Sequence, residues 1–396
     1  MARTQQTIYS QSQKQIKIMP LTYSRKTLFF NSLMEHIAYV LFLFRSLCLK
    51  RRPDNQQKCI LLVEPFGMGD VLSLSVILDP IKSKFPDSEI YILTKHGNKN
   101  IYASDSRIAH TFTAPIPWSK LSGQKKGSFS EWKQLLTVCK DIAKLKPDIG
   151  LDTRSEIRSQ ILMLLCNCKN RIGFKNYLNT NINVKGLLLT KAVDKPTVLH
   201  RYHMNRLLVE KGLDVNIGNL FFPTYKPIFE TLPNKTEQTS ILIHIGARWE
   251  YRQWKVENWI ELIKKLSLES NLEISITSGT TEIGMLDNIL EHTSITGEAS
   301  DYKQLANKIK STDLLICLDS GPMHLAQTLG IPVLALFGPG DFDLWQPIGQ
   351  KDKTCFHKQS CNPCLQHVCI KPDRPCMSFI SVEEVYNQAK ELLKVI

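Results

Sequence analysis

Apolar residues in the second half of the chain form short continuous runs, each followed by a polar turn that contains glycine. The run Leu314–Leu318 ends at Asp319-Ser320-Gly321-Pro322, and a helix-compatible segment, Met323–Leu329, then stops at Gly330. A second apolar run, Pro332–Phe337, follows. Such runs are typical of strands buried on both faces, and glycine is common just past a helix end. The pattern predicts a strand–helix–strand unit whose polar turns lie at the carboxyl ends of strands, where open α/β sheets bind ligands.

The first half of the chain repeats this arrangement. The apolar run Cys59–Val63 leads through the turn 64–70 into a predicted helix over Val71–Lys84 and a predicted strand over Glu89–Leu93. Strand, glycine turn, helix and strand within one short stretch are typical of a mononucleotide-binding half. Further elements are predicted at Ile149–Asp152, Ser155–Leu165 and Arg201–Lys211.

After a proline-containing segment at 222–233, which reads as an interdomain linker, the pattern restarts. A strand is predicted at Ser240–His244, a polar turn at 246–252, a helix at Val256–Leu266 and a strand at Leu272–Thr277. Two α/β sheets facing each other across a cleft account for this order with few assumptions. The expected division is a basic extension over 1–57, a first domain over 58–225 and a second over 226–396.

The extension contains an apolar stretch, Leu28–Leu49, behind a polar and basic segment, 1–27, that has no signal-peptide cleavage pattern. A bilayer span needs roughly 20 mostly apolar residues, whereas Glu35, His36 and Arg45 interrupt this stretch. Two interpretations stay open: a helix lying in the plane of a membrane surface, or a helix packed on its own domain.

Composition narrows the class of partner. The 396 residues are 43% hydrophobic and 22% charged, as in soluble globular proteins, and the net charge is +13. A basic surface suits phosphorylated substrates, an anionic membrane or nucleic acid. Because no nucleic-acid-binding module is recognisable, we expect no nucleic-acid partner.

The chain has eleven cysteines, and six of them are scattered, mostly within apolar runs, as expected for reduced core residues in a cytosolic protein. The other five lie in the segment 355–376. Cys361 and Cys364 have the spacing of zinc ligands, but no second pair does. We therefore expect free thiols or a disulfide in a structural segment, and no metal.

Three turns at strand ends carry the candidate chemistry. In the first, Asp70 begins a helix, where it could serve as a cap or as a carboxylate that takes a proton from an attacking hydroxyl. In the second, Gly246 allows close backbone approach, and the guanidinium of Arg252 suits a diphosphate. The third turn combines a hydroxyl, backbone N–H groups and an imidazole, from Asp319, Ser320, Gly321 and His324. Taken alone, a histidine in that place is more often a packing residue.

Together the turns resemble a known family. The segments 60–72 (Met-Gly-Asp-Val-Leu), 158–174 (Arg-Ser…Arg-Ile-Gly-Phe), 244–254 (His-Ile-Gly-Ala…Arg-Gln-Trp) and 319–339 are similar, in order and spacing, to glycosyltransferase family nine. This family contains the heptosyltransferases that build bacterial lipopolysaccharide core. The likeness covers roughly residues 58–385.

The resemblance implies a GT-B fold with two Rossmann-like domains, the first binding mainly the acceptor and the second the nucleotide-sugar donor. It also implies an inverting reaction that needs neither a metal nor a cofactor. By position, Asp70 would be the general base, Arg252 would replace the family's usual lysine at the diphosphate, and Glu282 would contact the nucleotide ribose. The remaining implied donor-binding residues are Gly246, Ala247, Asp319, Ser320, Gly321 and His324.

The expected activity is therefore transfer of heptose or a related sugar from a nucleoside-diphosphate sugar, with an ADP-sugar favoured, to lipopolysaccharide core or another glycolipid. It would take place in the cytoplasm, with peripheral contact at the inner membrane face as an open option. Arginine at 252 and the bulky turn at 248–251 leave the donor sugar open. A non-catalytic sugar-nucleotide or glycolipid binding protein of the same fold is the alternative, and Asp70 favours the enzyme.

Overall fold

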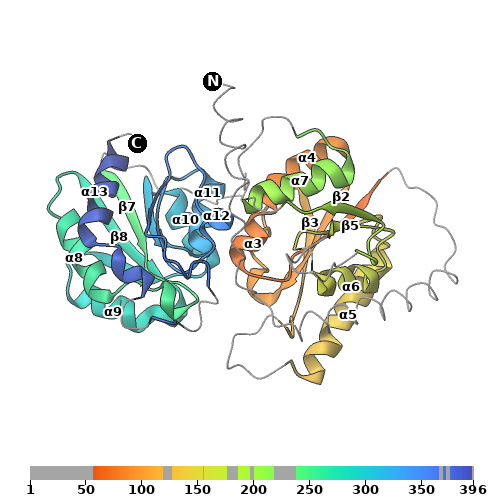
Figure 1. Cartoon of the computed structure of the whole chain (residues 1–396), viewed down its shortest axis with the longest axis horizontal. Coiled ribbons are helices and arrows are strands. Elements are labelled where there is room, and N and C mark those ends of the chain that lie inside the picture. The colour runs from red at the N-terminus through yellow and green to blue at the C-terminus, as the bar shows by residue number, and fades with distance from the viewer. Residues whose placement is uncertain are drawn as a thin grey trace.

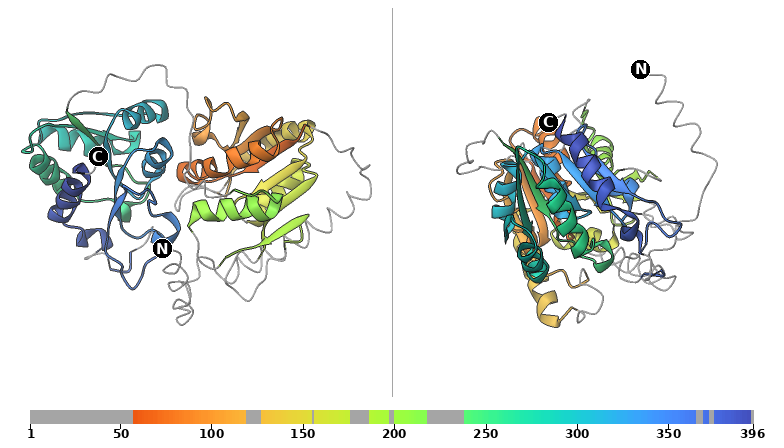
Figure 2. Two further views of the ribbon diagram at one scale, coloured as in Figure 1. Left: turned by 90° about the horizontal axis from the view of Figure 1, so that it is seen from above. Right: turned by 90° about the vertical axis from the view of Figure 1, so that its left-hand side faces the viewer.

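The computed structural model describes residues 57–118, 127–154, 156–175, 186–196, 200–217, 238–364, 369–371 and 375–394. The expected apolar stretch at 28–49, the linker at 222–233 and the boundary between the expected domains lie outside these residues. Two six-stranded sheets, each parallel throughout, form two lobes (Figures 1 and 2). The expectation of two α/β domains is confirmed.

The first sheet has the strand order β3-β2-β1-β4-β5-β6. Helices α3, α4 and α7 cover one face, and α5 and α6 cover the other (Figure 1). Its strands are β1 (Cys59–Val63), β2 (Glu89–Lys95), β3 (Ile108–Ala114), β4 (Ile149–Asp152), β5 (Asn170–Lys175) and β6 (Lys191–Asp194). Its helices are α3 (Met68–Leu72), α4 (Ser75–Lys84), α5 (Phe129–Leu145), α6 (Ile157–Leu165) and α7 (Arg201–Leu213), with a 3₁₀ turn, η2 (His96–Asn98).

The second sheet has the order β12-β11-β10-β7-β8-β9. Its outer face packs on α8, α9 and α13, and its inner face packs on α10 and α11. Its strands are β7 (Thr239–His244), β8 (Leu272–Ser278), β9 (Thr296–Ala299), β10 (Leu314–Leu318), β11 (Val333–Phe337) and β12 (Lys353–Phe356). Its helices are α8 (Val256–Leu266), α9 (Ile283–Glu291), α10 (Tyr302–Lys310), α11 (Gly321–Leu329), α12 (Phe342–Trp345) and α13 (Val382–Leu393), with 3₁₀ turns η3 (Glu250–Arg252), η4 (Thr280–Glu282) and η5 (Cys376–Phe379).

The strand–helix–strand unit at 314–337 forms as predicted. Strand β10 is buried along its whole length, as is β11, and Gly330 ends α11 in the left-handed conformation with φ 73°. The left-handed conformation costs glycine little energy, which explains why α11 ends at this residue.

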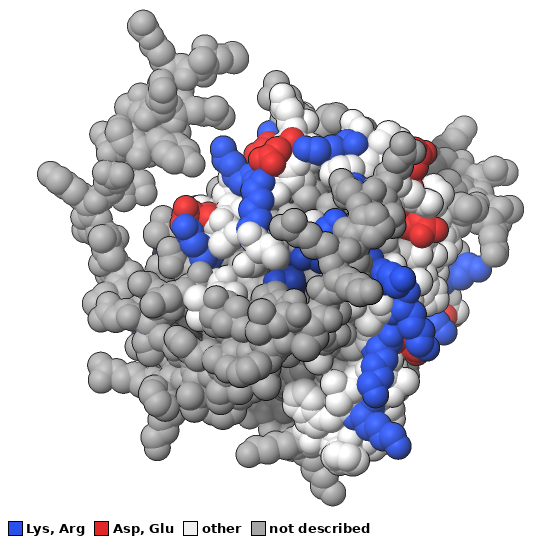
Figure 3. All heavy atoms as spheres, turned by 90° about the vertical axis from the view of Figure 1, so that its right-hand side faces the viewer, with Lys and Arg blue, Asp and Glu red and all other residues white. Residues whose placement is uncertain are grey.

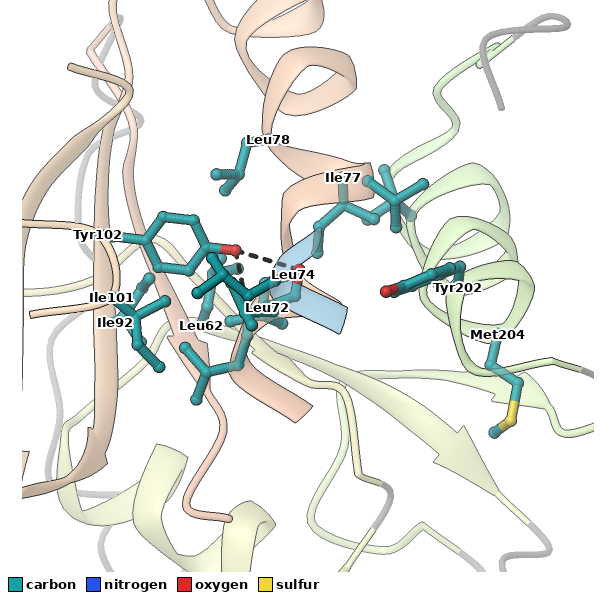
Figure 4. Close-up of a cluster of buried hydrophobic side chains, with 14 of the residues drawn as sticks. Leu62, Leu72, Leu74, Ile77, Leu78, Ile92, Ile101, Tyr102, Tyr202 and Met204 are labelled. Carbon is teal, nitrogen blue, oxygen red and sulfur yellow. Dashed lines mark hydrogen bonds between the residues drawn. The ribbon is translucent and has the colours of Figure 1, made fainter. Parts of the chain in front are cut away.

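One predicted helix, Val71–Lys84, is instead two. It begins earlier, at Met68, and breaks after Leu72 because distant side chains bind its carbonyl groups. The Tyr102 hydroxyl donates to the carbonyls of Val71 (3.0 Å) and Leu72 (3.3 Å), as Figure 4 shows among the buried apolar side chains. The Asn205 amide donates to the Ser73 carbonyl at 2.8 Å. These bonds fix the short helix α3, which carries Asp70.

The two lobes share part of their apolar core. Buried residues of α3, α4 and α7 belong to the same cluster as those of α10 and α11, and α3 packs directly on α11. The two helices that begin at the expected acceptor and donor turns therefore lie against each other. Within the described ranges, no helix is both long and apolar enough to cross a membrane.

Candidate active site

Strand order brings the turns of the first domain together. Strand β1 lies between β2 and β4, with Val63 beside Leu93 on one side and Asp152 on the other. Because the strands are parallel, their carboxyl ends meet at one edge. The residues that follow β1 and β4, including Glu64 and Arg154, therefore surround the start of α3.

Asp70 acts as a cap here, though not from the position that the sequence suggested. Helix α3 has Gly67 as its N-cap, and Asp70 is the third residue of the helix. Its Oδ2 accepts a bond from the Gly67 N–H at 3.0 Å, and its Oδ1 lies 2.5 Å from Nη1 of Arg154. A carboxylate has about four acceptor positions, so these contacts leave room for a further donor. Its side chain keeps 16% of its surface exposed, enough for a substrate hydroxyl to reach it.

Arg154 is a site residue that the sequence interpretation missed. It follows β4, pairs with Asp70, and lies with its guanidinium carbon 4.4 Å from the centre of the Phe66 ring. Stacking on one side and an ion pair on the other leave the guanidinium little freedom. Arg154 therefore holds Asp70 in one orientation. The only hint in the sequence is its place directly after a predicted strand.

Glu64 forms a buried polar group beneath this pair. Its Oε2 accepts bonds from Thr153 Oγ1 (2.8 Å) and Arg201 Nη2 (2.9 Å). Burial raises the pKa of the Glu64 carboxyl above its usual range, and the Asp70 charge raises it further, while Arg201 and Arg154 oppose the shift. The ion pair with Arg201 joins the end of β1 to the start of α7, and so stabilises the backbone around Asp70.

In the second domain, Arg252 and Asp319 lie together. Arg252, at the end of η3, donates from Nη1 to the Asp319 carbonyl at 2.6 Å, and the same nitrogen lies 3.1 Å from Asp319 Oδ2. Burial raises the pKa of the Asp319 carboxyl, and the Arg252 charge partly offsets that. A side chain at Gly340 would not fit, because its Cβ would lie 2.0 Å from Asp319 Oδ2. The two residues expected at the donor diphosphate thus share one site.

Ser320 and Gly321 begin helix α11. Ser320 is the N-cap residue, but its hydroxyl donates to the Leu318 carbonyl at 3.2 Å and no side chain caps the helix. Backbone N–H groups at an uncapped helix start favour an anion. Pro322, inside the first turn, has no N–H and needs none there. The turn therefore has the chemistry expected for a phosphate.

The turns after β7 and β8 also converge. A Cβ on Gly246 would lie 3.1 Å from Oε2 of Glu282, and a Cβ on Gly279 would lie 2.9 Å from the same atom. Glu282 Oε1 accepts a bond from Thr281 at 2.7 Å. The Ala247 carbonyl accepts a bond from Gln253 at 2.8 Å, which fixes the turn. Gly246, Ala247 and Glu282 therefore lie together, as expected.

His324 lies at the junction of the lobes. Its Nδ1 is 3.2 Å from the Tyr202 hydroxyl of α7, and its ring lies edge-on to Trp345 with the centroids 5.2 Å apart. Burial lowers the pKa of His324 to about 3, so the imidazole is neutral at physiological pH. A second interlobe bond joins His200 Nε2 to the Gln346 carbonyl at 2.8 Å. The His324 side chain is therefore packed among neighbouring side chains, as the packing interpretation of this histidine expects.

Gly69, beside Asp70, is the residue of the first domain against which His324 packs. A Cβ there would lie 2.4 Å from His324 Cδ2, and His324 is only 4% exposed. We expect Gly69→Ala to lower the free energy of unfolding by about 1–3 kcal/mol, because the added methyl group needs space that the His324 ring already occupies. Urea denaturation measures this.

The matched control is Gly284→Ala in α9, where an added Cβ meets no atom within 4 Å. That change should leave stability unchanged or raise it by up to about 1 kcal/mol, since alanine favours helix. Equal stability of the two variants would contradict the tight contact between Gly69 and His324.

Two cations from opposite lobes lie near Asp70. They are Lys95, at the end of β2, and Arg248, in the turn after β7. Burial lowers the pKa of Lys95, and so does the nearby Arg248 charge, while Asp70 opposes the shift. With Arg154 and Arg252, these residues place four cationic side chains at the junction, and Arg154 and Arg252 are paired with Asp70 and Asp319. Cationic side chains in a shared site attract a diphosphate.

The cysteine segment shows no metal arrangement in the part of the chain that the structure describes, where no three His, Cys, Asp or Glu side chains are grouped to hold an ion. The described cysteines are free thiols. Burial raises the pKa of Cys376 to about 11, and the neighbouring Cys364 and Cys361 add to the shift. The raised pKa disfavours the thiolate form of Cys376 at neutral pH.

Known proteins resemble this chain along most of its length. The profile of glycosyltransferase family 9 (heptosyltransferase) matches residues 136–373. Lipooligosaccharide heptosyltransferase 2 of Campylobacter jejuni is 25% identical over 351 residues, 83% of this chain and 97% of its own length. Lipopolysaccharide core heptosyltransferase OpsX of Haemophilus influenzae is 23% identical, over 70% of this chain and 78% of its own length.

Solved structures agree on the fold. Escherichia coli heptosyltransferase WaaC with ADP-2-deoxy-2-fluoro heptose superposes with a TM-score of 0.66, covering 84% of this chain and 99% of that one at 16% identity. Both are two parallel α/β domains in the GT-B arrangement. The family match spans more than half of the chain and includes the donor turns built above. The chain belongs to glycosyltransferase family 9, the heptosyltransferases, and is a glycosyltransferase.

Proposed function

We propose that this enzyme transfers heptose from ADP-heptose to the core of lipopolysaccharide or lipooligosaccharide, with inversion at the anomeric carbon and without a metal ion. Its sequence relatives are lipooligosaccharide and lipopolysaccharide heptosyltransferases, and WaaC has been solved with an ADP-heptose analogue. The observation that carries the proposal is the position of Asp70. Its neighbour Gly69 touches the helix that starts at the expected donor turn, so the proposed base and the proposed anion site lie side by side.

We infer the reaction from these positions. An acceptor hydroxyl attacks the anomeric carbon of the donor on the face opposite the diphosphate, and its proton passes to the Asp70 carboxylate. The new bond joins the acceptor oxygen to the anomeric carbon. The bond from that carbon to the phosphate oxygen breaks, and its electron pair leaves with ADP. Arg154 keeps Asp70 aimed at the hydroxyl throughout.

The leaving diphosphate gains charge as the bond breaks, and fixed positive groups must meet it. In this proposal the N–H groups at the start of α11 and the guanidinium of Arg252 do so. Arg248 and Lys95 add to the positive field. Glu282, beside Gly246, would accept bonds from the ribose hydroxyls. Arg252 contacts Asp319 in the structure, so the same guanidinium could bridge that carboxylate and the diphosphate.

The acceptor side fits a glycolipid with phosphorylated sugars, because Arg154 and Lys95 lie on the first domain near Asp70. Such an acceptor is anchored in a membrane. We therefore infer that the enzyme works at the inner face of the cytoplasmic membrane, and that the stretch 28–49 is one candidate for contact with it.

A screen of donors tests this function. At a hundredfold excess over Kd, ADP-heptose should add about 2.7 kcal/mol to stability, read as a thermal shift. UDP-glucose and GDP-mannose should add much less. Stabilisation by one of these and not by ADP-heptose would move the proposal to another donor, and stabilisation by none would remove the donor site.

Transfer itself is followed by the mass of one heptose gained on a purified core acceptor. The rate should persist in EDTA, and proton NMR should show the anomeric configuration opposite to that of the donor. Loss of activity in EDTA, or retention of configuration, would contradict the mechanism.

A further inference from the structure

Helix α5 exposes an apolar stripe on the first domain. Phe129, Trp132 and Leu136 are 86%, 44% and 42% exposed, and their spacing places them on one face of the helix. The neighbouring face, about a quarter turn round the helix, is occupied by Leu135, Cys139 and Ile142, which are buried against the sheet. Because that core-facing side is already filled, the stripe is additional to what the fold needs. Figure 1 places α5 at the lower edge of the first domain.

Lysines share this exposed face. Lys133, Lys140 and Lys144 are exposed and, by their spacing, form a row beside the apolar stripe, with Lys133 and Lys140 each four residues after one of its members. Lys144 pairs with Asp141 at 2.6 Å. The acidic Glu131 lies half-buried and caps the helix through the Ser128 N–H. Figure 3 shows a column of basic side chains descending to the lower edge of this domain beside uncharged surface.

The stripe is continuous with the side of the domain that carries the site. The Trp132 and Trp118 rings lie 5.6 Å apart, and Arg158 lies over Trp118 at 5.6 Å. Arg158 belongs to α6, the helix that follows Arg154 and its strand β4. An object bound along α5 would therefore be close to the acceptor side of the junction.

We propose that this face of α5 docks on the surface of a bilayer that contains anionic lipid. Aromatic and leucine side chains beside a row of lysines are the composition of helices that lie in a membrane interface, with the rings among the headgroups and the ammonium groups at lipid phosphates. The proposal rests on the proposed function, because a glycolipid acceptor must be reached at a membrane. A second copy of the chain fits less well, since a symmetric pair through this face would bring the lysine rows together.

Vesicle binding of the full chain tests the apolar stripe. The wild type should sediment with vesicles of phosphatidylcholine and phosphatidylglycerol, and the triple variant Phe129→Ser, Trp132→Ser, Leu136→Ser should bind at least about tenfold more weakly. The matched control is Leu268→Ser, which removes an 87% exposed leucine from the other domain and should change nothing. Equal binding by the triple variant and the wild type would overturn the proposal and leave another segment, such as 28–49, as the membrane contact.

Charge and insertion give independent readouts. Lys133→Glu should weaken binding to the anionic vesicles by about fivefold or more, whereas Lys264→Glu on α8 should not. With brominated lipids the wild-type fluorescence should be quenched, and Trp132→Phe should still bind but lose most of that quenching. Persistent quenching in Trp132→Phe, or binding indifferent to lipid charge, would contradict docking through α5.

These measurements need neither donor nor acceptor. Failure of the donor screen with intact vesicle binding would reject the proposed function alone, and the reverse result would reject the docking face alone. Circular dichroism and thermal unfolding of each variant confirm that the fold is kept, as expected for exposed side chains.

Discussion

Asp70→Asn should lower the rate of sugar transfer roughly 10²- to 10⁴-fold, because the variant has no carboxylate to take the proton of the acceptor hydroxyl. The amide oxygen can still accept the bond from the Gly67 N–H that caps α3. It cannot pair ionically with Arg154, 2.5 Å away in the wild type. We therefore expect a folded protein that binds ADP-heptose and hardly turns it over. Single-turnover kinetics with saturating donor measure the loss.

The control must separate catalysis from capping. Asp301 caps α10 by accepting the Gln304 N–H at 2.9 Å, in the second domain, and it is absent from the proposed mechanism. Asp301→Asn should leave transfer unchanged. It should lower the free energy of unfolding no more than Asp70→Asn does, since each change alters one helix cap. If Asp70→Asn transferred heptose at the wild-type rate, another group would have to be the base. Donor binding without transfer in the wild type would instead favour a sugar-nucleotide binding protein.

Much of the fold was predictable because strands buried on both faces leave a direct signal in the sequence. The prediction for β10 agrees with the structure at both ends, and so does that for α8. The division of Val71–Lys84 into α3 and α4 was not predictable. It depends on Tyr102 and Asn205, 30 and 132 residues away from the carbonyls that they bind. Local periodicity holds no record of such partners.

The same limit separates the predicted site residues from those that were missed. Gly246, Glu282 and Asp319 follow strands, so a βα pattern points to them. Arg154 lies 84 residues from Asp70 in the sequence, and Arg201 lies 137 residues from Glu64. A charged residue becomes part of a site through its partner, and the partner is known only from the fold. His324 was predicted from its own turn, but its surroundings were not, because its neighbours Tyr202 and Gly69 come from the other domain.

Arg252 has two roles to separate, since it neutralises the buried Asp319 and is proposed to hold the diphosphate. Removing it leaves an uncompensated carboxylate, which should cost about 1–3 kcal/mol of stability by itself. A simple alanine variant therefore confuses a folding defect with a binding defect. The companion change Asp319→Asn removes the stranded charge, so the double variant should recover most of the lost stability.

Arg252→Ala should weaken the binding of ADP-heptose about 10- to 100-fold, the contribution of a hydrogen-bonded charge on a phosphate. Arg252→Lys should weaken the binding of ADP-heptose less, because lysine keeps the positive charge and lacks only the paired donors of the guanidinium. Titration calorimetry measures both affinities. The control is Arg206→Ala, which removes a partly buried ion pair with Glu210 on α7 and should bind normally. The double variant Arg252→Ala, Asp319→Asn should regain stability and still bind weakly. Full affinity in that protein would mean that Arg252 serves only to neutralise Asp319, and that the N–H groups of α11 hold the diphosphate without it.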